Sequence, residues 1–418
     1  MERDRGTGHA GGGGRGSEGR RREDKYRDDR RREKGKRSLT SSKPTPSFTQ
    51  PPVILERRPV SVKPAAHAVS TATSVDEAPL QTPASQPPAS QAQTSETQKQ
   101  SSSSTPLATK KPMRLMSDIG KVNYETLVKS LVDQPGYYAV GVLGKQGVGK
   151  SSILSAFCPS PSKAFAIQPP EFQLSGLHKT QGIDIYITPE RIILLDTQPI
   201  LSLSVLERAL KHEAMVENLG PEVWLELHSL QLAILLFSIC NVVLVVTDKE
   251  PDEMMLEFLR RVDMLRPWTQ ENPLAMAGGH HFAELVFVCN RCHEGDMTQS
   301  AYRRICENVI SKLSFTEFGM SGAISMPRAM AMYSQVRDPG TGIIPNIFLL
   351  PQKSDEMVPE TYEVLVRALR NLVFGFPRRP VKLSEKDWFK GLVKLWDVIQ
   401  RSDLIRTYVK TLRRIREG

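Results

Sequence analysis

Short hydrophobic runs separated by amphipathic stretches fill the chain from about residue 121 onward. The runs are rich in Val, Ile and Leu and have the length of buried strands. Between them, apolar residues recur at helical spacing, as in 252–265 and 302–313. This alternation predicts an α/β fold with a mainly parallel sheet flanked by helices on both faces. The expected strands are YYAVGVLG (137–144), IDIYI (183–187), RIILLD (191–196), NVVLVV (241–246), ELVFV (284–288) and NIFLL (346–350).

One run, LQLAILLFSICNVVLVV (230–246), is apolar enough to raise the question of a membrane segment. It is shorter than the roughly 20 residues that a spanning helix needs. Gln231, Ser238 and Asn241 also interrupt it. The VVLVV part has the β-branched composition of a strand buried on both faces. We therefore expect a buried helix that leads into a buried parallel strand, and no association with a membrane.

The two ends of the chain differ from this middle part. Residues 1–118 are rich in Arg, Gly, Ser, Pro and Gln, and such a composition buries too little apolar surface to offset the entropy of ordering. We expect a disordered basic tail there, an α/β domain over 119–376, and a helical segment over 377–418 that packs on the domain or on a partner. Its helix is predicted to begin near Ser384 and Asp387. The apolar stripe of this segment comprises Trp388, Leu392, Leu395, Trp396, Ile399 and Leu404.

Charge and cysteine content limit the kinds of protein this chain can be. The formal net charge of +10 divides into +9 for residues 1–120, −6 for 121–370 and +7 for 371–418. Because the middle is mildly acidic, a nucleic-acid surface on the domain is not supported. The five cysteines have no disulfide-scaffold spacing, and the N-terminus has no apolar signal region. We expect a reduced, cytoplasmic protein, with a nuclear pool as the alternative location.

The stretch GKQGVGKSS (144–152) fits the phosphate-binding pattern G-x-x-x-x-G-K-[ST]. The four fixed places are held by Gly144, Gly149, Lys150 and Ser151. Glycines let backbone N–H groups surround phosphates, the lysine reaches the β- and γ-phosphates, and the serine hydroxyl ligates Mg²⁺. A strand is expected before the loop and a helix after it, so we predict a P-loop GTPase-like domain. The whole loop is assigned to the nucleotide: Gly144, Lys145, Gln146, Gly147, Val148, Gly149, Lys150, Ser151 and Ser152.

Two further residues are expected on the Mg²⁺ side of the loop, together with Ser151. Asp196 ends the strand RIILLD, where its carboxylate can hold Mg²⁺ through water. Thr180 lies in the loop before the strand IDIYI, where a P-loop GTPase places the threonine that senses the γ-phosphate. The alternative for Thr180 is an ordinary loop threonine.

The residues that drive hydrolysis are altered. GTPases of this class have D-x-x-G after the third strand, and the glycine N–H bonds the γ-phosphate. Here the run is DTQP, and Pro199 has no N–H to donate. Ile200 stands where many such enzymes place the glutamine that orients water, and Gln198 comes two positions early. The sequence therefore predicts nucleotide binding without efficient hydrolysis.

The base-binding run is also incomplete. In place of N-K-x-D the chain reads CNRCH, in which Asn290 is present, Arg291 replaces the lysine and His293 replaces the aspartate. Both GTP or GDP and ATP therefore stay open as ligands, with Mg²⁺, and Asn290 is assigned to nucleotide binding. CNRCH also fits C-x-x-C-H, a haem or zinc pattern, but no second ligand pair lies nearby. We favour Cys289 as a core residue at a strand end.

Several motifs together resemble one known family. GVLGKQGVGKS, TQGIDIYITPERI, LLDTQPIL and EKDWF with LWD are similar to the SMG-nine factors of nonsense-mediated mRNA decay, over roughly residues 120–418. The proline of LLDTQPIL departs from ordinary GTPases in the manner of that family. The resemblance implies a GTPase-like domain that pairs with a related partner, the SMG-eight factor. It further implies that the pair binds and restrains the PI3K-like kinase that phosphorylates the decay helicase.

Three functions are compatible with these residues. The first, which we favour, is a regulatory subunit whose bound nucleotide stabilises the fold and an interface, a pseudo-GTPase rather than an enzyme. The second is an active switch GTPase or ATPase that takes its catalytic residue from a partner. The third is direct RNA binding through the Arg-rich tail, which predicts a strong dependence on salt.

Overall fold

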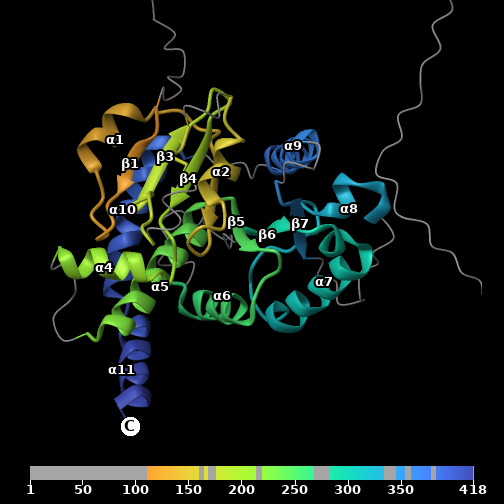
Figure 1. Ribbon diagram of the computed structural model, residues 1–418. Helices are drawn as coiled ribbons and strands as arrows, with labels where there is room; N and C mark the ends of the chain where they lie inside the picture. The colour runs from red at the N-terminus through yellow and green to blue at the C-terminus, as the bar shows by residue number, and fades with distance from the viewer. Residues whose placement is uncertain are drawn as a thin grey trace, which may run out of the picture. The chain divides into compact units, whose positions relative to one another are not determined.

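The computed structural model describes residues 111–159, 164–167, 176–212, 219–267, 283–333, 345–353, 359–377 and 383–417. The expected tail therefore lies outside the described residues, except for its last positions. One seven-stranded sheet organises the described part, in the order β1-β3-β4-β2-β5-β6-β7 (Figure 1). Its strands are β1 (Met113–Met116), β2 (Tyr138–Leu143), β3 (Ile183–Ile187), β4 (Ile192–Thr197), β5 (Val242–Asp248), β6 (Glu284–Cys292) and β7 (Asn346–Pro351).

The sheet is mainly parallel, as the alternating pattern predicted. β2 pairs in parallel with β4 on one side and with β5 on the other, and β6 and β7 continue the parallel run. β3 pairs with β4 in antiparallel register because only four residues, 188–191, join them. Arg191 adopts a left-handed conformation in this turn, with φ of 62°. The predicted mixed α/β fold is confirmed.

The strand β1 corrects the expected extent of the tail. We expected disorder through residue 118, yet Met113–Met116 pair with β3 in antiparallel register. Leu115 and Met116 are buried in the core, and the Arg114 guanidinium donates to the Asp184 carboxylate at 2.5 Å. A four-residue strand is hard to find in the sequence because its partner lies about 70 positions away and supplies the pairing.

Helices cover both faces of the sheet (Figure 1). Those expected over 252–265 and 302–313 are present as α6 and α7 with nearly the same bounds. The helices are α1 (Tyr124–Ser130), α2 (Lys150–Ser155), α4 (Leu203–Lys211), α5 (Pro221–Ile239), α6 (Glu253–Leu265), α7 (Gln299–Leu313), α8 (Met326–Ala329), α9 (Pro359–Gly375), α10 (Glu385–Arg401) and α11 (Asp403–Glu417). Two short 3₁₀ helices are η2 (Glu294–Met297) and η3 (Ala331–Tyr333).

The long apolar run forms α5 followed directly by β5, as expected. By length and composition α5 could cross a membrane, but 83% of its most apolar 18-residue window is buried inside the protein. A helix that is apolar on all sides is the usual form of a core helix. The Asn241 side chain fixes the helix-to-strand step by accepting from the Ala139 N–H at 2.8 Å.

The C-terminal helix α10 packs into the same core as the sheet. Ser384 caps it by accepting from the Asp387 N–H at 3.1 Å, at the predicted start. The indole N–H of Trp388 donates to the Ile239 carbonyl at 3.0 Å, so α10 is fixed to the end of α5. The first five residues of the predicted stripe are buried, whereas Leu404 lies on α11 and is 47% exposed.

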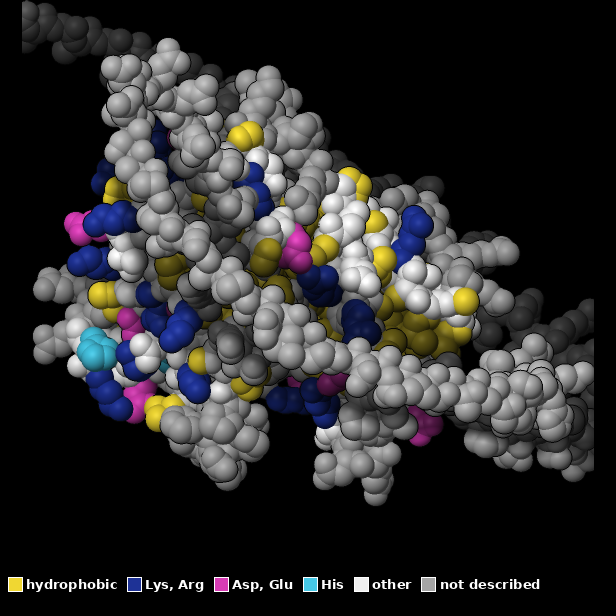
Figure 2. All heavy atoms as spheres, turned by 90° about the horizontal axis from the view of Figure 1, so that it is seen from above, with side chains coloured by type: hydrophobic (Ala, Val, Ile, Leu, Met, Phe, Trp, Pro, Cys, Tyr) yellow, Lys and Arg dark blue, Asp and Glu magenta, His cyan; other side chains and the backbone are white. Residues whose placement is uncertain are grey.

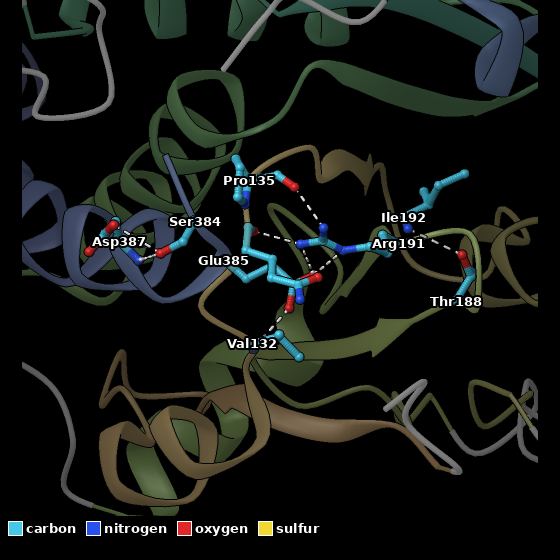
Figure 3. A network of polar contacts seen from close by, with 9 residues as sticks. Val132, Pro135, Thr188, Arg191, Ile192, Ser384, Glu385 and Asp387 are labelled. Carbon is cyan, nitrogen blue, oxygen red and sulfur yellow. Dashed lines mark hydrogen bonds and ion pairs between the residues drawn. The ribbon is translucent and has the colours of Figure 1, made fainter. Parts of the chain in front are cut away.

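A polar network joins the start of α10 to the β3–β4 turn (Figure 3). The buried Glu385 carboxylate accepts from the Arg191 guanidinium at 3.0 and 3.1 Å. Its second oxygen accepts from the Val132 N–H at 3.1 Å. Arg191 also donates to the carbonyls of Gln134 and Pro135, each at 2.6 Å. Residues about 190 positions apart are thereby held together below the sheet edge.

Candidate functional site

The glycine loop leaves the central strand β2 and enters α2 at the carboxyl ends of the parallel strands. Gly144, Gly147 and Gly149 all have positive φ, of 155°, 77° and 97°. A Cβ atom on Gly149 would lie 2.5 Å from the Asn290 amide nitrogen, and one on Gly144 would collide with the Val246 carbonyl. Glycine is therefore required at these two places both by backbone conformation and by space.

Lys150 lies beneath this loop with its amine turned back toward it. The amine donates to the Lys145 carbonyl at 2.9 Å. Burial lowers the pKa of Lys150 to about 8, although the Asp196 carboxylate acts in the opposite direction. An amine held in this way is positioned to meet phosphate oxygens at the loop.

The three residues predicted for Mg²⁺ come together in the structure. The Asp196 Oδ2 atom accepts from the Ser151 hydroxyl at 2.7 Å and from the Thr180 hydroxyl at 2.9 Å. The two hydroxyl oxygens lie 3.2 Å apart. One carboxylate and two hydroxyls are oxygen ligands of the kind that Mg²⁺ takes alongside phosphate and water.

Asp196 itself fits a cation. Its side chain is fully buried, and its Oδ1 atom has no hydrogen-bond partner. Burial raises the pKa of Asp196 to about 6, partly offset by the two hydroxyls and Lys150. A buried carboxylate oxygen without a donor is costly, and a bound cation would satisfy it. Among the described residues no cluster of three or more His, Cys, Asp and Glu could hold a metal.

A hollow open to solvent lies over the loop, with about 580 Å³ of empty space. Part of this volume is open solvent, and the part that compares with a cavity volume is about 100 Å³. Lys150, Lys179 and Arg291 line it, and none of its described lining residues is Asp or Glu, so the hollow suits a polyanion. The described lining residues are Gln146, Gly147, Gly149, Lys150, Ser151, Ser152, Ala166, Ile167, His178, Lys179, Thr180, Thr197, Pro199 and Arg291.

On the face that Figure 2 shows, the Lys and Arg side chains do not form one continuous positive surface. In the view of Figure 2, Lys and Arg side chains lie in several separate groups, with hydrophobic and acidic side chains between them.

The structure shows how the three residues 198–200 that follow β4 are held. Pro199 lines the hollow, and Ile200 is buried with its N–H donating to the Gly144 carbonyl at 3.2 Å. Gln198 is 1% exposed and does not line the hollow. Its Oε1 accepts from the Gly182 N–H at 2.7 Å, and its Nε2 lies 2.9 Å from the His228 Nε2. The side chain of Gln198 therefore makes its hydrogen bonds in the core, at the end of β4, and not at the hollow.

Asn290 supports the glycine loop by a hydrogen bond and does not line the hollow. Its side-chain amide donates to the Val148 carbonyl at 2.8 Å, and its backbone carbonyl accepts from the Lys249 N–H at 2.7 Å. Four other residues assigned to the ligand are likewise not among the lining residues of the hollow: Gly144, Lys145, Val148 and Asp196. The Lys145 amine instead forms an ion pair with Asp252. Asn290, Gly144, Lys145 and Val148 shape the loop, whereas Asp196 lies directly behind the lining residues Ser151 and Thr180. The others of the predicted set line the hollow.

Arg291 is a site residue that the motif comparison did not select. Its guanidinium donates to the Gly147 carbonyl and lies 4.0 Å from the Asp248 carboxylate. Its φ of 58° shows that the backbone turns sharply at the end of β6. In the sequence, the only indication that Arg291 belongs to the site was its place at the lysine position of N-K-x-D. His293, at the aspartate position, is exposed and begins η2, with its N–H donating to Asp296 at 3.0 Å.

A group of polar residues beside the loop also went unpredicted. His178, Ser202 and Ser204 gather around the side chain of Gln146. Burial lowers the pKa of His178 to about 4, with the charges of Arg208 and Lys150 contributing. Nothing in their sequence spacing marks these residues, because three separate segments bring them together.

The C-x-x-C-H run lies in the core. Cys289 is buried within β6, as favoured from the sequence, and Cys292 is buried at its end. Burial raises the pKa of the Cys292 thiol to about 12. All five cysteines are free and buried. Thiols in this state are poor metal ligands, since binding requires the thiolate.

Fold and site together define a mixed α/β protein with a glycine-rich phosphate-type loop at the carboxyl edge of a mainly parallel sheet. No family model matches the chain. Among solved structures, the bacterial selenocysteine-specific elongation factor EF-Sec is similar, with a TM-score of 0.29 and 11% identity. That match covers 58% of this chain and 30% of the other, a likeness too low to bear on fold or function.

Curated relatives carry one name. The chain is 30% identical over 331 residues to the nonsense-mediated mRNA decay factor SMG9 of Xenopus tropicalis, which covers 69% of this chain. It is 28% identical over 324 residues to the factor of the same name from Salmo salar and 26% identical over 290 residues to Protein SMG9 of Drosophila melanogaster. These matches cover 68% and 62% of this chain, and 64% and 52% of the two relatives. The resemblance to SMG-nine factors is confirmed, and the chain spans 64% of the length of the Xenopus tropicalis relative.

Proposed function

We propose that this chain acts in nonsense-mediated mRNA decay as an SMG9-type regulatory subunit that binds a nucleoside polyphosphate with Mg²⁺ and does not turn it over efficiently. Two independent lines support the proposal. The relatives that match most of its length are named as factors of that pathway. The hollow over the glycine loop has the cations and the oxygen ligands that a Mg²⁺–polyphosphate ligand requires.

The proposal of slow turnover rests on the contrast between the two sides of the hollow. On the phosphate side, Lys150, Ser151 and Asp196 are in place. On the side from which water would attack, Pro199 has no N–H and Gln198 is occupied in the core. Without a group to orient water, in-line attack on the γ-phosphate loses most of its assistance. The expected result is a tightly held nucleotide with very slow turnover.

The identity of the base stays open between guanine and adenine. An aspartate that would accept from the guanine edge is replaced by the exposed His293. The Arg291 guanidinium donates to the Gly147 carbonyl of the loop, a contact that does not distinguish bases. GTP or GDP and ATP are therefore both candidates.

The partners follow from the resemblance. The proposed heterodimer partner is an SMG-eight-like protein with a GTPase-like domain, and the proposed target of the pair is the PI3K-like kinase of the decay pathway. A bound nucleotide would stabilise the folded domain by linkage, since it binds the folded chain and not the unfolded one. Loss of the nucleotide is then expected to weaken partner binding through the stability of the site. We expect this to take place in the cytoplasm.

The test uses the full chain co-purified with its SMG-eight-like partner. Bound nucleotide is released by denaturation and identified by ion-pair chromatography, and turnover of added nucleotide is then followed. We expect stoichiometric nucleotide and turnover far below the ~1 s⁻¹ of assisted GTPases. Lys150→Met should lose the nucleotide. Lys145→Met is the matched control, because it removes a charge from the same loop without removing a lining residue.

Two results would overturn the proposal. Absence of any nucleotide from wild-type protein, with no binding on addition, would show that the loop is not a nucleotide site. Partner-stimulated turnover near the rate of assisted GTPases would instead support the second candidate, an active switch with a residue supplied by the partner.

A further inference from the structure

The side chain of Gln146 joins three segments around the hollow. Its amide nitrogen donates to the carbonyls of Gly176 and Leu177, at 2.8 and 3.2 Å. Its amide oxygen accepts from the hydroxyls of Ser202 and Ser204, at 2.5 and 2.7 Å. All four positions that an amide side chain offers are thereby used. The glycine loop is tied both to the segment that carries Thr180 and to the first turn of α4.

The contacts around Gln146 close into a ring. The Ser202 and Ser204 hydroxyls lie 2.8 Å apart, and the His178 Nδ1 atom lies 2.7 Å from the Ser204 hydroxyl. Ser204 donates its proton to Gln146, so His178 donates from Nδ1 to Ser204. His178 therefore adds a second link between the 176–180 segment and α4.

Ser202 is used against its local preference. It occupies the N-cap position of α4, where a serine side chain normally accepts from a backbone N–H of the first turn. Its hydroxyl makes no such bond and is directed to Gln146 instead. The helix gives up a stabilising cap so that this hydroxyl can reach the glycine loop.

The end of β4, where Thr197 lines the hollow, is also held by hydrogen bonds. Thr197 donates from its hydroxyl to the Val142 carbonyl at 2.7 Å. The Leu201 N–H donates to the Ser229 hydroxyl at 2.9 Å, and Leu201 has a positive φ of 50°. Together with the bonds of Gln198, these contacts fasten the end of β4 to the core before α4 begins.

We propose that Gln146 is a positioning residue that holds the 176–180 segment and α4 in one arrangement, so that the site binds di- and triphosphate nucleotides with similar affinity. The inference rests on the proposed nucleotide binding and goes beyond it. Beyond direct contacts to the third phosphate, a site discriminates that phosphate when it favours a second conformation that is close in free energy to the first. Moving either segment here would break the hydrogen bonds at Gln146 and the buried contact between His178 and Ser204. Breaking the buried contact leaves polar atoms unpaired, which disfavours the second conformation.

Two variants separate positioning from direct contact with the ligand. Gln146→Ala removes the link but also changes a residue that lines the hollow. Ser202→Ala combined with Ser204→Ala removes the α4 side of the link, together with the His178 contact, from positions that do not line the hollow. Gln400→Ala is the matched control, because Gln400 is exposed on α10. All three are made in the full chain with its partner.

The first readout is hydrogen exchange without nucleotide. We expect amide protection in 176–180 and in α4 to fall by about tenfold or more in both link variants, and to stay unchanged in the control. The second readout is the ratio of dissociation constants for GDP against GTP and for ADP against ATP. In wild type each ratio should lie within about threefold. In both link variants it should move beyond about tenfold, since the freed Thr180 segment can then respond to the third phosphate.

The outcomes distinguish this inference from the proposed function. Nucleotide binding by wild type with strong preference for the triphosphate would overturn the inference and leave the proposed function intact. Unchanged protection in both link variants would overturn it as well, even if the affinities were similar. Binding of neither nucleotide by wild type would overturn both.

Discussion

The buried carboxylate of Asp196 should destabilise the folded chain when it is ionised and no cation is bound, and the size of this effect can be predicted. The carboxylate is fully buried, one of its oxygens has no partner, and its pKa is raised from 3.8 to about 6, chiefly by burial. Without a cation, the folded chain therefore holds a proton on Asp196 at a pH where the unfolded chain has released it. Folding stability must then fall as the pH rises from about 4 through about 6.

The size of this effect follows from the two pKa values. Their difference corresponds to about 3 kcal/mol between the protonated and ionised forms. Asp196→Asn removes the titration and keeps an oxygen that can accept from Ser151 and Thr180. We expect the unfolding free energy of the variant, relative to wild type, to rise between pH 4 and pH 7.5 by about 3 kcal/mol, in the presence of a chelator. Titration of Lys150 contributes little between pH 4 and pH 7.5, because its pKa of about 8 lies above this range.

The assay is urea unfolding followed by tryptophan fluorescence at several pH values, for wild type, Asp196→Asn and the exposed control Asp397→Asn. With Mg²⁺ and nucleotide added, the unfolding free energy of wild type should rise and that of Asp196→Asn should not, since only wild type gains the binding energy. A difference between wild type and Asp196→Asn that stays constant from pH 4 to pH 7.5 would refute the argument. So would an equal gain in stability on adding Mg²⁺ and nucleotide to both.

Three further substitutions test other parts of the structure. Glu385→Ala should lower the unfolding free energy by about 3 kcal/mol, because it removes the carboxylate that accepts from the Val132 N–H and pairs with the Arg191 charge. Denaturant unfolding beside Arg191→Met/Glu385→Leu, which removes both charges and should recover most of the loss, checks this. Gly149→Ala should weaken nucleotide affinity by about tenfold or more, measured by calorimetry, because its φ of 97° and the nearby Asn290 amide exclude a Cβ atom. Ser384→Ala should cost about 1 kcal/mol of stability through loss of the α10 cap, and Ser384→Asp should largely restore it.

Much of the fold was predictable because it depends on local patterns. Runs of Val, Ile and Leu are stable only when buried, and their spacing located six strands of the sheet within a few residues. Ser384 marked the start of α10 because capping is decided within one helical turn. β1 was missed because its four residues become a strand only by pairing with β3.

The sequence by itself determined the glycine loop and the loss of the water-orienting groups. Glycine conformations and the missing N–H of Pro199 are properties of the backbone at those positions and need no partner. Only the tertiary structure decided what the neighbouring side chains do. Asn290 supports the loop at Val148, 142 positions away, and Gln146 binds residues 30 to 58 positions away. Such contacts depend on how strands and loops from distant parts of the chain meet at one sheet edge, and local spacing carries no information about that.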